Sequence, residues 1–327
     1  MVGLCVVVAF SMHCQRDAKV QMFAGPATAD ASRQRSDANM ASADRTESSQ
    51  SSDVLVADAQ TVDSGDADMA PGGAMVAVAS IQAKPVALPE TANYEDFAKR
   101  DPLGFLRFCW DRYKTNVQDY RCTFTKRERI NGEYMPEQIA DVRFRESPFS
   151  VDMTFTKNIG ECARALYVAD KWVDDEGNQQ AWAKPGGAIV RLLISKILQP
   201  IHGARAQNAS RRTIDQFGFG KSFELIIRYS AKAQAENALT LNYTGEGSVG
   251  DRPTYQFERL LPYDGNEDNY PDRLLVFHID QESLLPVACY AYSDKEGNDL
   301  LGSYIYTDVK LNPGYSPEDF DPDVINF

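Results

Sequence analysis

The sequence lacks the motifs that carry the common zinc and hydrolytic chemistries. It contains no CxxC pair, no cysteine–histidine spacing typical of zinc sites and no GxSxG nucleophile elbow. Only three histidines are present, His13, His202 and His278. A nucleophile–histidine mechanism therefore has few bases available, and we expect no catalytic residue, no metal and no cofactor.

An excess of positive charge is also lacking, since the formal net charge is −13 at pH 7. Nucleic-acid binding needs a concentrated basic surface, so we expect no nucleic-acid partner. The basic run from Lys126 to Arg129 is interrupted by Glu128, and we interpret it as one solvated face of a strand. The acidic runs at 264–268 and 318–323 lack the closing ligand of a calcium loop and are interpreted as solvated turns.

Aromatic residues are nearly missing from the first part of the chain. They make up 10% of the sequence, yet only Phe10 and Phe23 precede Tyr94. Residues 15–92, rich in Ala, Ser and Asp, cannot bury enough apolar surface to offset their conformational entropy, which predicts a disordered acidic low-complexity tether. Residues 93–327 are predicted to form a single globular domain.

Residues 1–14 begin with the apolar run MVGLCVVVAF, which is typical of a signal peptide and too short to span a bilayer. This leader-like segment predicts export to the periplasm or the cell envelope. Cys14 is a candidate site of lipid anchoring after cleavage. His13 stands directly before it, where a small residue is expected, so an ordinary apolar leader is the alternative.

Four cysteines belong to the predicted globular part, Cys109, Cys122, Cys162 and Cys289. In an oxidising compartment they could form one or two disulfides. Lone cysteines also behave as small apolar groups, so buried free thiols are an equal alternative. The spacing alone does not decide between them.

The globular part opens with a helix followed by strands with one apolar face. Apolar residues recur every three or four positions after Pro102, which predicts an amphipathic helix that begins there. From Tyr120, apolar and polar residues then alternate, turn at Asn131-Gly132, and alternate again over 139–146 and 149–155. Period two with one apolar face indicates antiparallel strands with one side in water.

The middle of the chain has helical spacing instead. The segments IVRLLISKIL (189–198) and SFELIIRYSAKAQAEN (222–237) predict two inserted helices joined by an irregular link over 202–212. Strand signals resume after it and bring the total to eight to ten strands. The predicted fold is α+β: a curved antiparallel sheet, or incomplete β-barrel, whose apolar face is covered by an N-terminal helix and two inserted helices.

Several motifs, in order, carry a resemblance to a known family. DYRCTFTKRERINGE, RFRESPFSVDM, LYVADKW, TIDQFGFGKSFELI, FHIDQESLLPVACYAY and YIYTDVKLNPGYSPEDFD resemble an uncharacterised family of exported bacterial proteins, domain of unknown function 1571. The resemblance covers about residues 94–327. That family is similar in plan to the LolA/LolB-like lipoprotein carriers, half-barrels with an apolar cavity for acyl chains. The resemblance implies that fold and no catalytic residue.

The inward face of the half-barrel is the predicted binding site. Its aromatic and sulfur-containing candidates either pack on the helices as core or line a ligand cavity: Phe124, Phe144, Met153, Phe155, Tyr167, Phe257, Tyr290 and Tyr304. Three arginines of the link, Arg205, Arg211 and Arg212, could meet an anionic head group or be ordinary surface residues. His202 and His278 are interpreted as structural.

Three functions follow, in order of preference. The first is a non-catalytic cell-envelope protein that binds an acyl chain, lipid or lipoprotein in the half-barrel. The alternative is an interaction or sensor module with a filled core and an envelope protein as partner. A hydrolase ranks third, because no nucleophile, base or metal set is recognisable.

Overall fold

The computed structural model describes residues 93–187 and 195–327. The chain begins there with two helices, α1 (Tyr94–Arg100) and α2 (Pro102–Asn116). The side chain of Asp101 accepts a hydrogen bond from the Gly104 amide at 2.8 Å and so caps α2, with Pro102 at its first position. The predicted helix therefore begins at the expected residue.

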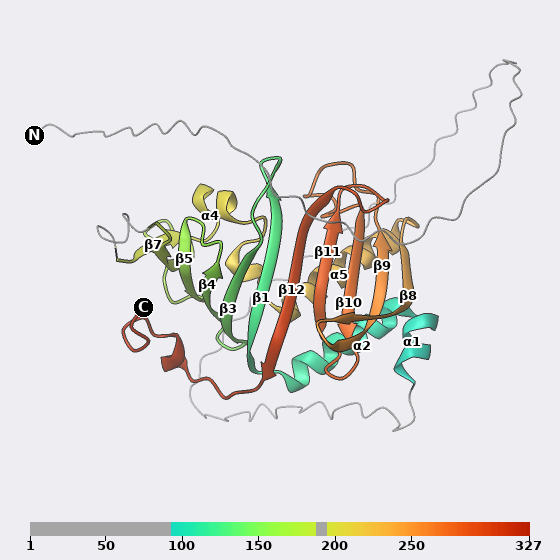
Figure 1. The fold of residues 1–327 in the computed structure, drawn as a ribbon, viewed down its shortest axis with the longest axis horizontal. Coiled ribbons are helices and arrows are strands. Elements are labelled where there is room, and N and C mark those ends of the chain that lie inside the picture. The colour runs from blue at the N-terminus through green and yellow to red at the C-terminus, as the bar shows by residue number, and fades with distance from the viewer. Residues whose placement is uncertain (1–92, 188–194) are drawn as a thin grey trace, which may run out of the picture. The chain divides into compact units, whose positions relative to one another are not determined.

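Twelve strands form one open antiparallel sheet (Figure 1). The order across it is β7-β6-β5-β4-β3-β1-β12-β11-β10-β9-β8, and the short β2 pairs only with β1. The predicted architecture is confirmed, with more strands than expected. Their bounds are β1 (Asp119–Ile130), β2 (Glu133–Tyr134), β3 (Gln138–Arg145), β4 (Ser150–Lys157), β5 (Cys162–Val168), β6 (Gln180–Pro185), β7 (Ile197–Pro200), β8 (Thr240–Val249), β9 (Arg252–Leu260), β10 (Leu274–Asp280), β11 (Pro286–Tyr292) and β12 (Leu300–Leu311).

Between β7 and β8 lie α4 (Ala204–Ala209), the 3-10 helix η1 (Ile214–Gln216) and α5 (Phe219–Ala235). α5 is the second predicted inserted helix. Most of the first, 189–194, lies outside the described residues. Its predicted end is wrong, because Ile197–Pro200 pairs with β6 as a strand.

One face of the sheet, called here the inward face, packs against helices. In Figure 1, α2 and α5 lie behind the half of the sheet formed by β8–β12. Phe105 of α2 stacks on Phe257 of β9 at 5.8 Å between ring centroids, and Tyr113 of α2 contacts Phe219 of α5 at 6.5 Å. The main core lies between these helices and the sheet.

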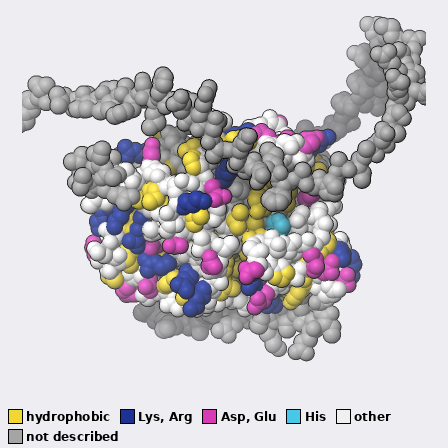
Figure 2. Space-filling view, in the orientation of Figure 1, with side chains coloured by type: hydrophobic (Ala, Val, Ile, Leu, Met, Phe, Trp, Pro, Cys, Tyr) yellow, Lys and Arg dark blue, Asp and Glu magenta, His cyan; other side chains and the backbone are white. Residues whose placement is uncertain are grey.

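The opposite face, called here the outer face, is partly covered by the end of the chain. Phe320, in the 3-10 helix η2 (Pro317–Phe320), and the C-terminal Phe327 bury Leu166 and Val168 of β5. Elsewhere the outer face carries charge of both signs (Figure 2). Basic side chains gather mainly on the left of that view, the side of β3–β5 in Figure 1.

The four cysteines of the described residues are free thiols. Cys109, Cys122 and Cys289 are buried in the core, and burial raises the pKa of Cys289 to about 12 and that of Cys162 to about 11. No helix in the described ranges is both long and apolar enough to cross a bilayer.

Candidate functional site

Most of the predicted inward residues gather beneath one segment, residues 201–217, called here the covering link. It contains α4 and η1 and lies over the inward face of β1, β3, β4 and β5. Phe217, at its end, contacts the ring of Phe124 at 5.0 Å and that of Phe144 at 6.2 Å. The link therefore covers the aromatic part of the sheet that the helices leave free.

Six of the eight predicted residues belong to this region, and two do not. Phe257 faces inward but lies under α2, stacked on Phe277 at 5.1 Å. Tyr290 lies on the outer face, where its ring contacts His278, so its predicted inward position is wrong. The six are Phe124, Phe144, Met153, Phe155, Tyr167 and Tyr304.

The region beneath the link is filled by side chains that contact one another. Phe144 meets Phe149 at 5.1 Å, and Tyr167 packs with Ile201 and Ile214 of the link. Phe124, Phe144 and Tyr167 are all less than 5% exposed. Four of the six are thus buried in core clusters, and the half-buried Phe155 and Tyr304 pack against the main core. Two hollows in the described part of the chain lie elsewhere, and both are lined by Arg145 and by a residue of the C-terminal segment.

A buried polar cluster holds the link to β1. Lys126 and Glu128 face inward, are 6% and 2% exposed, and form an ion pair of 2.8 Å. The Ser210 hydroxyl donates to Glu128 at 2.9 Å and lies 2.9 Å from Lys126 Nζ, which also donates to the Ala209 carbonyl at 3.4 Å. The Arg211 amide and the Tyr304 hydroxyl donate to Glu128 at 3.2 and 2.9 Å. We call this cluster the latch.

The latch contradicts the interpretation of residues 126–129 as one solvated face of a strand. Lys126 and Glu128 are buried, while Arg127 is exposed. The signal was present, because the alternation that turns Tyr120, Cys122 and Phe124 inward continues to positions 126 and 128. Burial raises the pKa of Tyr304, and the adjacent Glu128 carboxylate adds to this shift. Tyr304 therefore stays a neutral donor.

The three predicted arginines of the link differ in their surroundings. Arg211 is a structural residue: its guanidinium donates to Glu267 at 2.9 Å and to the carbonyl of Pro271, and its side chain is 6% exposed. Burial lowers the pKa of Arg211, but Tyr304 and Glu267 outweigh it and the pKa rises. Arg205 is exposed and Arg212 half-buried.

The two histidines in the described ranges lie in different parts of the fold. His202 lies 3.4 Å from Asp215 within the exposed part of the link. His278 is hydrogen-bonded to Thr254 at 2.9 Å on the outer face, and burial lowers its pKa. The described residues contain no group of three or more side chains suited to hold a metal ion.

Residues 117–327 match a family described as protein of unknown function (DUF1571). No curated protein matches the chain.

Solved structures resemble it at low TM-score. A DUF1329 family protein from Desulfovibrio piger is 12% identical (TM-score 0.36; 68% of this chain, 98% of that chain). A putative outer membrane lipoprotein-sorting protein domain from Vibrio parahaemolyticus is 13% identical (0.33; 68% and 98%). The lipoprotein LppX of Mycobacterium tuberculosis is 15% identical (0.33; 68% and 100%). These likenesses support no statement about a ligand.

Proposed function

The chain belongs to the DUF1571 family of proteins of unknown function, and from its site we propose that it is a non-catalytic cell-envelope protein that binds an apolar or amphiphilic ligand. The ligand would be an acyl chain, a lipid or a lipoprotein. It would lie on the inward face of β1, β3, β4 and β12, in place of the covering link.

The observation that carries this proposal is the way the covering link is attached. α4 buries none of its own residues, and the segment 209–211 is held by the polar latch. Only the two end residues of the link, Ile201 and Phe217, are buried. A segment with few buried apolar contacts opens at a lower free energy than the core beneath it. Once open, it would expose the rings of Phe124, Phe155 and Tyr304.

Those rings offer a surface suited to an acyl chain. Each methylene removed from water contributes about 0.8 kcal/mol, so eight methylenes would offset the loss of the link's own few apolar contacts. When the link moves, Lys126 and Glu128 would both lose their hydrogen bonds to Ser210. A polar head group that both donates and accepts hydrogen bonds could replace that hydroxyl. The polar end of the site is thus supplied by the latch itself.

The test uses a fluorescent fatty acid, cis-parinarate, with the whole chain. We expect micromolar binding, and native mass spectrometry should find one acyl chain per protein. Ser210→Ala weakens the latch and should speed binding several-fold. Ser283→Ala is the control, because its hydroxyl bonds only Asp280 in a remote turn at 2.8 Å. The proposal would be contradicted if cis-parinarate showed no increase in fluorescence with the protein and native mass spectrometry found no bound acyl chain.

A second function is favoured by the filled interior. If the link does not open, the chain is an interaction module for another envelope protein. The edge strand β8 suits this, since it alternates exposed and half-buried residues along Thr240–Val249 and is paired on one side only. In that case the fatty acid would not bind, and substitutions on β8 would abolish capture of the partner.

Export is part of the proposal as well. The leader-like residues 1–14 and the tether at 15–92 lie outside the described residues. We propose a periplasmic location with lipid attachment at Cys14, which cell fractionation and palmitate labelling of the Cys14→Ser variant would test. Loss of label without loss of export would assign the anchor to Cys14.

A further inference from the structure

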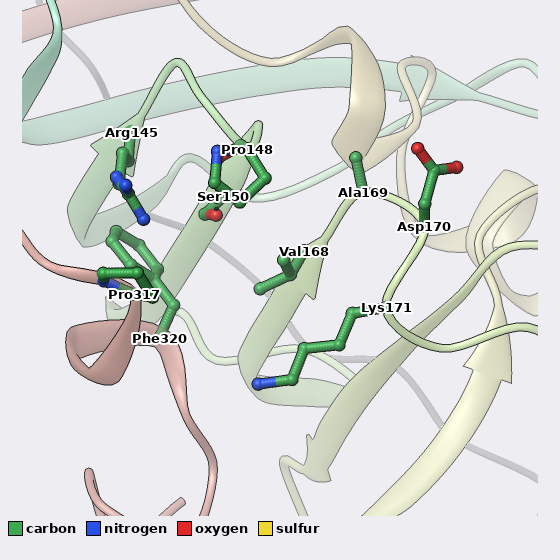
Figure 3. Close-up of a pocket in the computed structure, with 9 residues that line it drawn as sticks. All are labelled: Arg145, Pro148, Ser150, Val168, Ala169, Asp170, Lys171, Pro317 and Phe320. Atoms are coloured by element: carbon green, nitrogen blue, oxygen red, sulfur yellow. Dashed lines mark hydrogen bonds between the residues drawn. The ribbon is translucent and has the colours of Figure 1, made fainter.

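A hollow of about 290 Å³ lies on the outer face, on the opposite side of the sheet from the proposed acyl site. It is bounded by the end of β3, the start of β4, the turn after β5 and η2 (Figure 3). Its volume is near the lower limit of ligand pockets, which suits a small molecule or a head group. It is lined by Arg145, Pro148, Ser150, Val168, Ala169, Asp170, Lys171, Pro317 and Phe320.

Arg145 is the unusual residue of this hollow. Its Nη1 atom is buried and has no hydrogen-bond partner among the described residues. A buried donor without an acceptor is unfavourable, and more so where the group is charged. In Figure 3 its guanidinium points toward Pro317 and Phe320, along the wall of the hollow.

In contrast to Arg145, two neighbouring arginines on the same face form ion pairs with a carboxylate. Arg143 donates to Asp152 at 3.0 Å, and Arg164 donates to the same carboxylate at 2.7 Å. Arg145 has no ion pair of this kind among the described residues. Glu318 is close enough for Arg145 to contribute to the lowering of its pKa, after the larger effect of Ser316.

The remaining charges leave room for an anion. The carboxylate of Asp170 accepts a hydrogen bond from Gln179 at 3.0 Å and lies at the opposite end of the hollow from Arg145 (Figure 3). Lys171 lies 3.2 Å from Asp321, and both are more than a third exposed, so this pair is weak and the ammonium is accessible. Val168, Pro317 and Phe320 supply apolar wall beside these groups.

A second hollow, of about 340 Å³, also has Arg145 in its lining. It is lined by Lys114, Val117, Gln118, Asp119, Arg145, Glu146, Ser147 and Tyr315. Arg145 thus borders two hollows.

We propose that the hollow at Arg145 binds a carboxylate or phosphate group carried on a short apolar moiety. The guanidinium supplies a planar fork of donors that matches either anion, Lys171 adds charge, and Phe320 and Val168 contact the apolar part. The source is either a free small acid or the head group of an anionic lipid. This site is independent of the covering link and of the proposed acyl site.

The experiment measures binding of hexanoate and hexyl phosphate to the whole chain by calorimetry, and of phosphatidylglycerol vesicles by sedimentation. We expect Arg145→Gln to weaken binding at least about tenfold. Arg145→Lys should weaken it less, because lysine keeps the positive charge and loses only the planar set of donors. Arg121→Gln is the matched control, since it removes the same charge from an exposed position on the same face. Binding to soluble acids assigns a small-molecule source, and binding to vesicles alone assigns a lipid source.

Equal binding by Arg145→Gln and the unchanged chain, or no binding by any probe up to about 10 mM, would overturn the proposal. Thermal unfolding of each variant without ligand checks that it is folded. If Arg145→Gln does not fold, the affinity of Arg145→Lys tests the proposal instead. Ser210→Ala should leave this binding unchanged. The result is therefore separable from the fate of the acyl site.

Discussion

At the scale of single residues, the most sensitive feature is a fully buried ion pair. Arg259 of β9 faces the core with 0% exposure and is bonded to both oxygens of Asp272 at 3.0 Å and to the Ile226 carbonyl of α5 at 3.1 Å. Removing one partner leaves the other charge buried and uncompensated. Asp272→Ala should lower the free energy of unfolding in urea by about 3–5 kcal/mol.

The control for this substitution is an exposed pair. Lys157 and Glu137 lie 3.3 Å apart with about half of each side chain in water. Glu137→Ala should change stability by less than about 0.5 kcal/mol. A similar loss of unfolding free energy in both variants would show that the buried Arg259–Asp272 pair contributes no more to stability than an exposed pair.

His278 makes stability depend on pH near neutrality. Burial lowers its pKa below the ordinary value of about 6.5, so the folded protein binds fewer protons than the unfolded chain as pH falls. The stabilisation is present above pH about 6.5 and is lost as pH falls through the folded pKa. Urea unfolding at pH 7.5 and 5.5 should show this loss, and His278→Gln should reduce it. An unchanged slope in the variant would assign the effect to other groups.

At the scale of elements, the alternation of β1 was predictable, but the phase of β11 was not. From Asp119 to Thr125 of β1 only every second residue is polar, so the inward face of this half can be identified from the sequence alone. The other half places Lys126 and Glu128 inward and was misinterpreted. In β11, PVACYAY has apolar residues on both faces, and the pattern cannot say whether Cys289 or Tyr290 points inward. The pairing of Phe277 with Cys289 decides it.

The segment 189–198 illustrates a second limit. Its apolar spacing fits a helix, yet Ile197 and Leu198 pair with Ala183 and Trp182 across β6. Short apolar runs suit either structure, and pairing with a distant strand is decided by tertiary contacts. The link was predictable as irregular, whereas its latch to Lys126 and Glu128 depends on residues about 80 positions away in the sequence.

We expect the hydrogen bonds of the latch to determine how readily the covering link opens. Glu128→Gln removes the charge that accepts bonds from Lys126, Ser210 and the Arg211 amide. Hydrogen bonds to charged groups contribute about 1.5–3 kcal/mol, so opening of the link should become about 2 kcal/mol easier and amide exchange over 204–216 about thirtyfold faster. Glu224→Gln, in an exposed pair on α5, is the matched control. Unchanged exchange would show that apolar contacts alone hold the link.

At the scale of the whole molecule, both faces of the sheet are partly covered, although the sequence predicted one wet face. The difference arises at β5, where Leu166 and Tyr167 are both buried and point to opposite sides. Leu166 packs under Phe320 and Phe327. The interpretation of 318–323 as a solvated turn is therefore wrong for Phe320, which is 1% exposed. The sequence signal for a covering segment was the single aromatic residue, Phe320, among these acids.

The last prediction concerns which parts of the chain contribute to folding. All core clusters of the described residues lie within 93–327, and the composition of residues 15–92 predicts that they bury little. Residues 93–327 alone should therefore unfold in urea with the same midpoint and the same m-value as the whole chain, because m scales with the surface exposed on unfolding.

Removing residues 313–327 is the contrasting experiment, since it uncovers Leu166 and Val168 and removes the buried Phe320 and Phe327. Truncating one buried phenylalanine costs about 3–5 kcal/mol, so this deletion should lower the midpoint clearly. If deletion of residues 1–92 lowered the midpoint and the m-value as well, part of that segment would have to pack on the globular domain. The description of it as a tether would then be wrong.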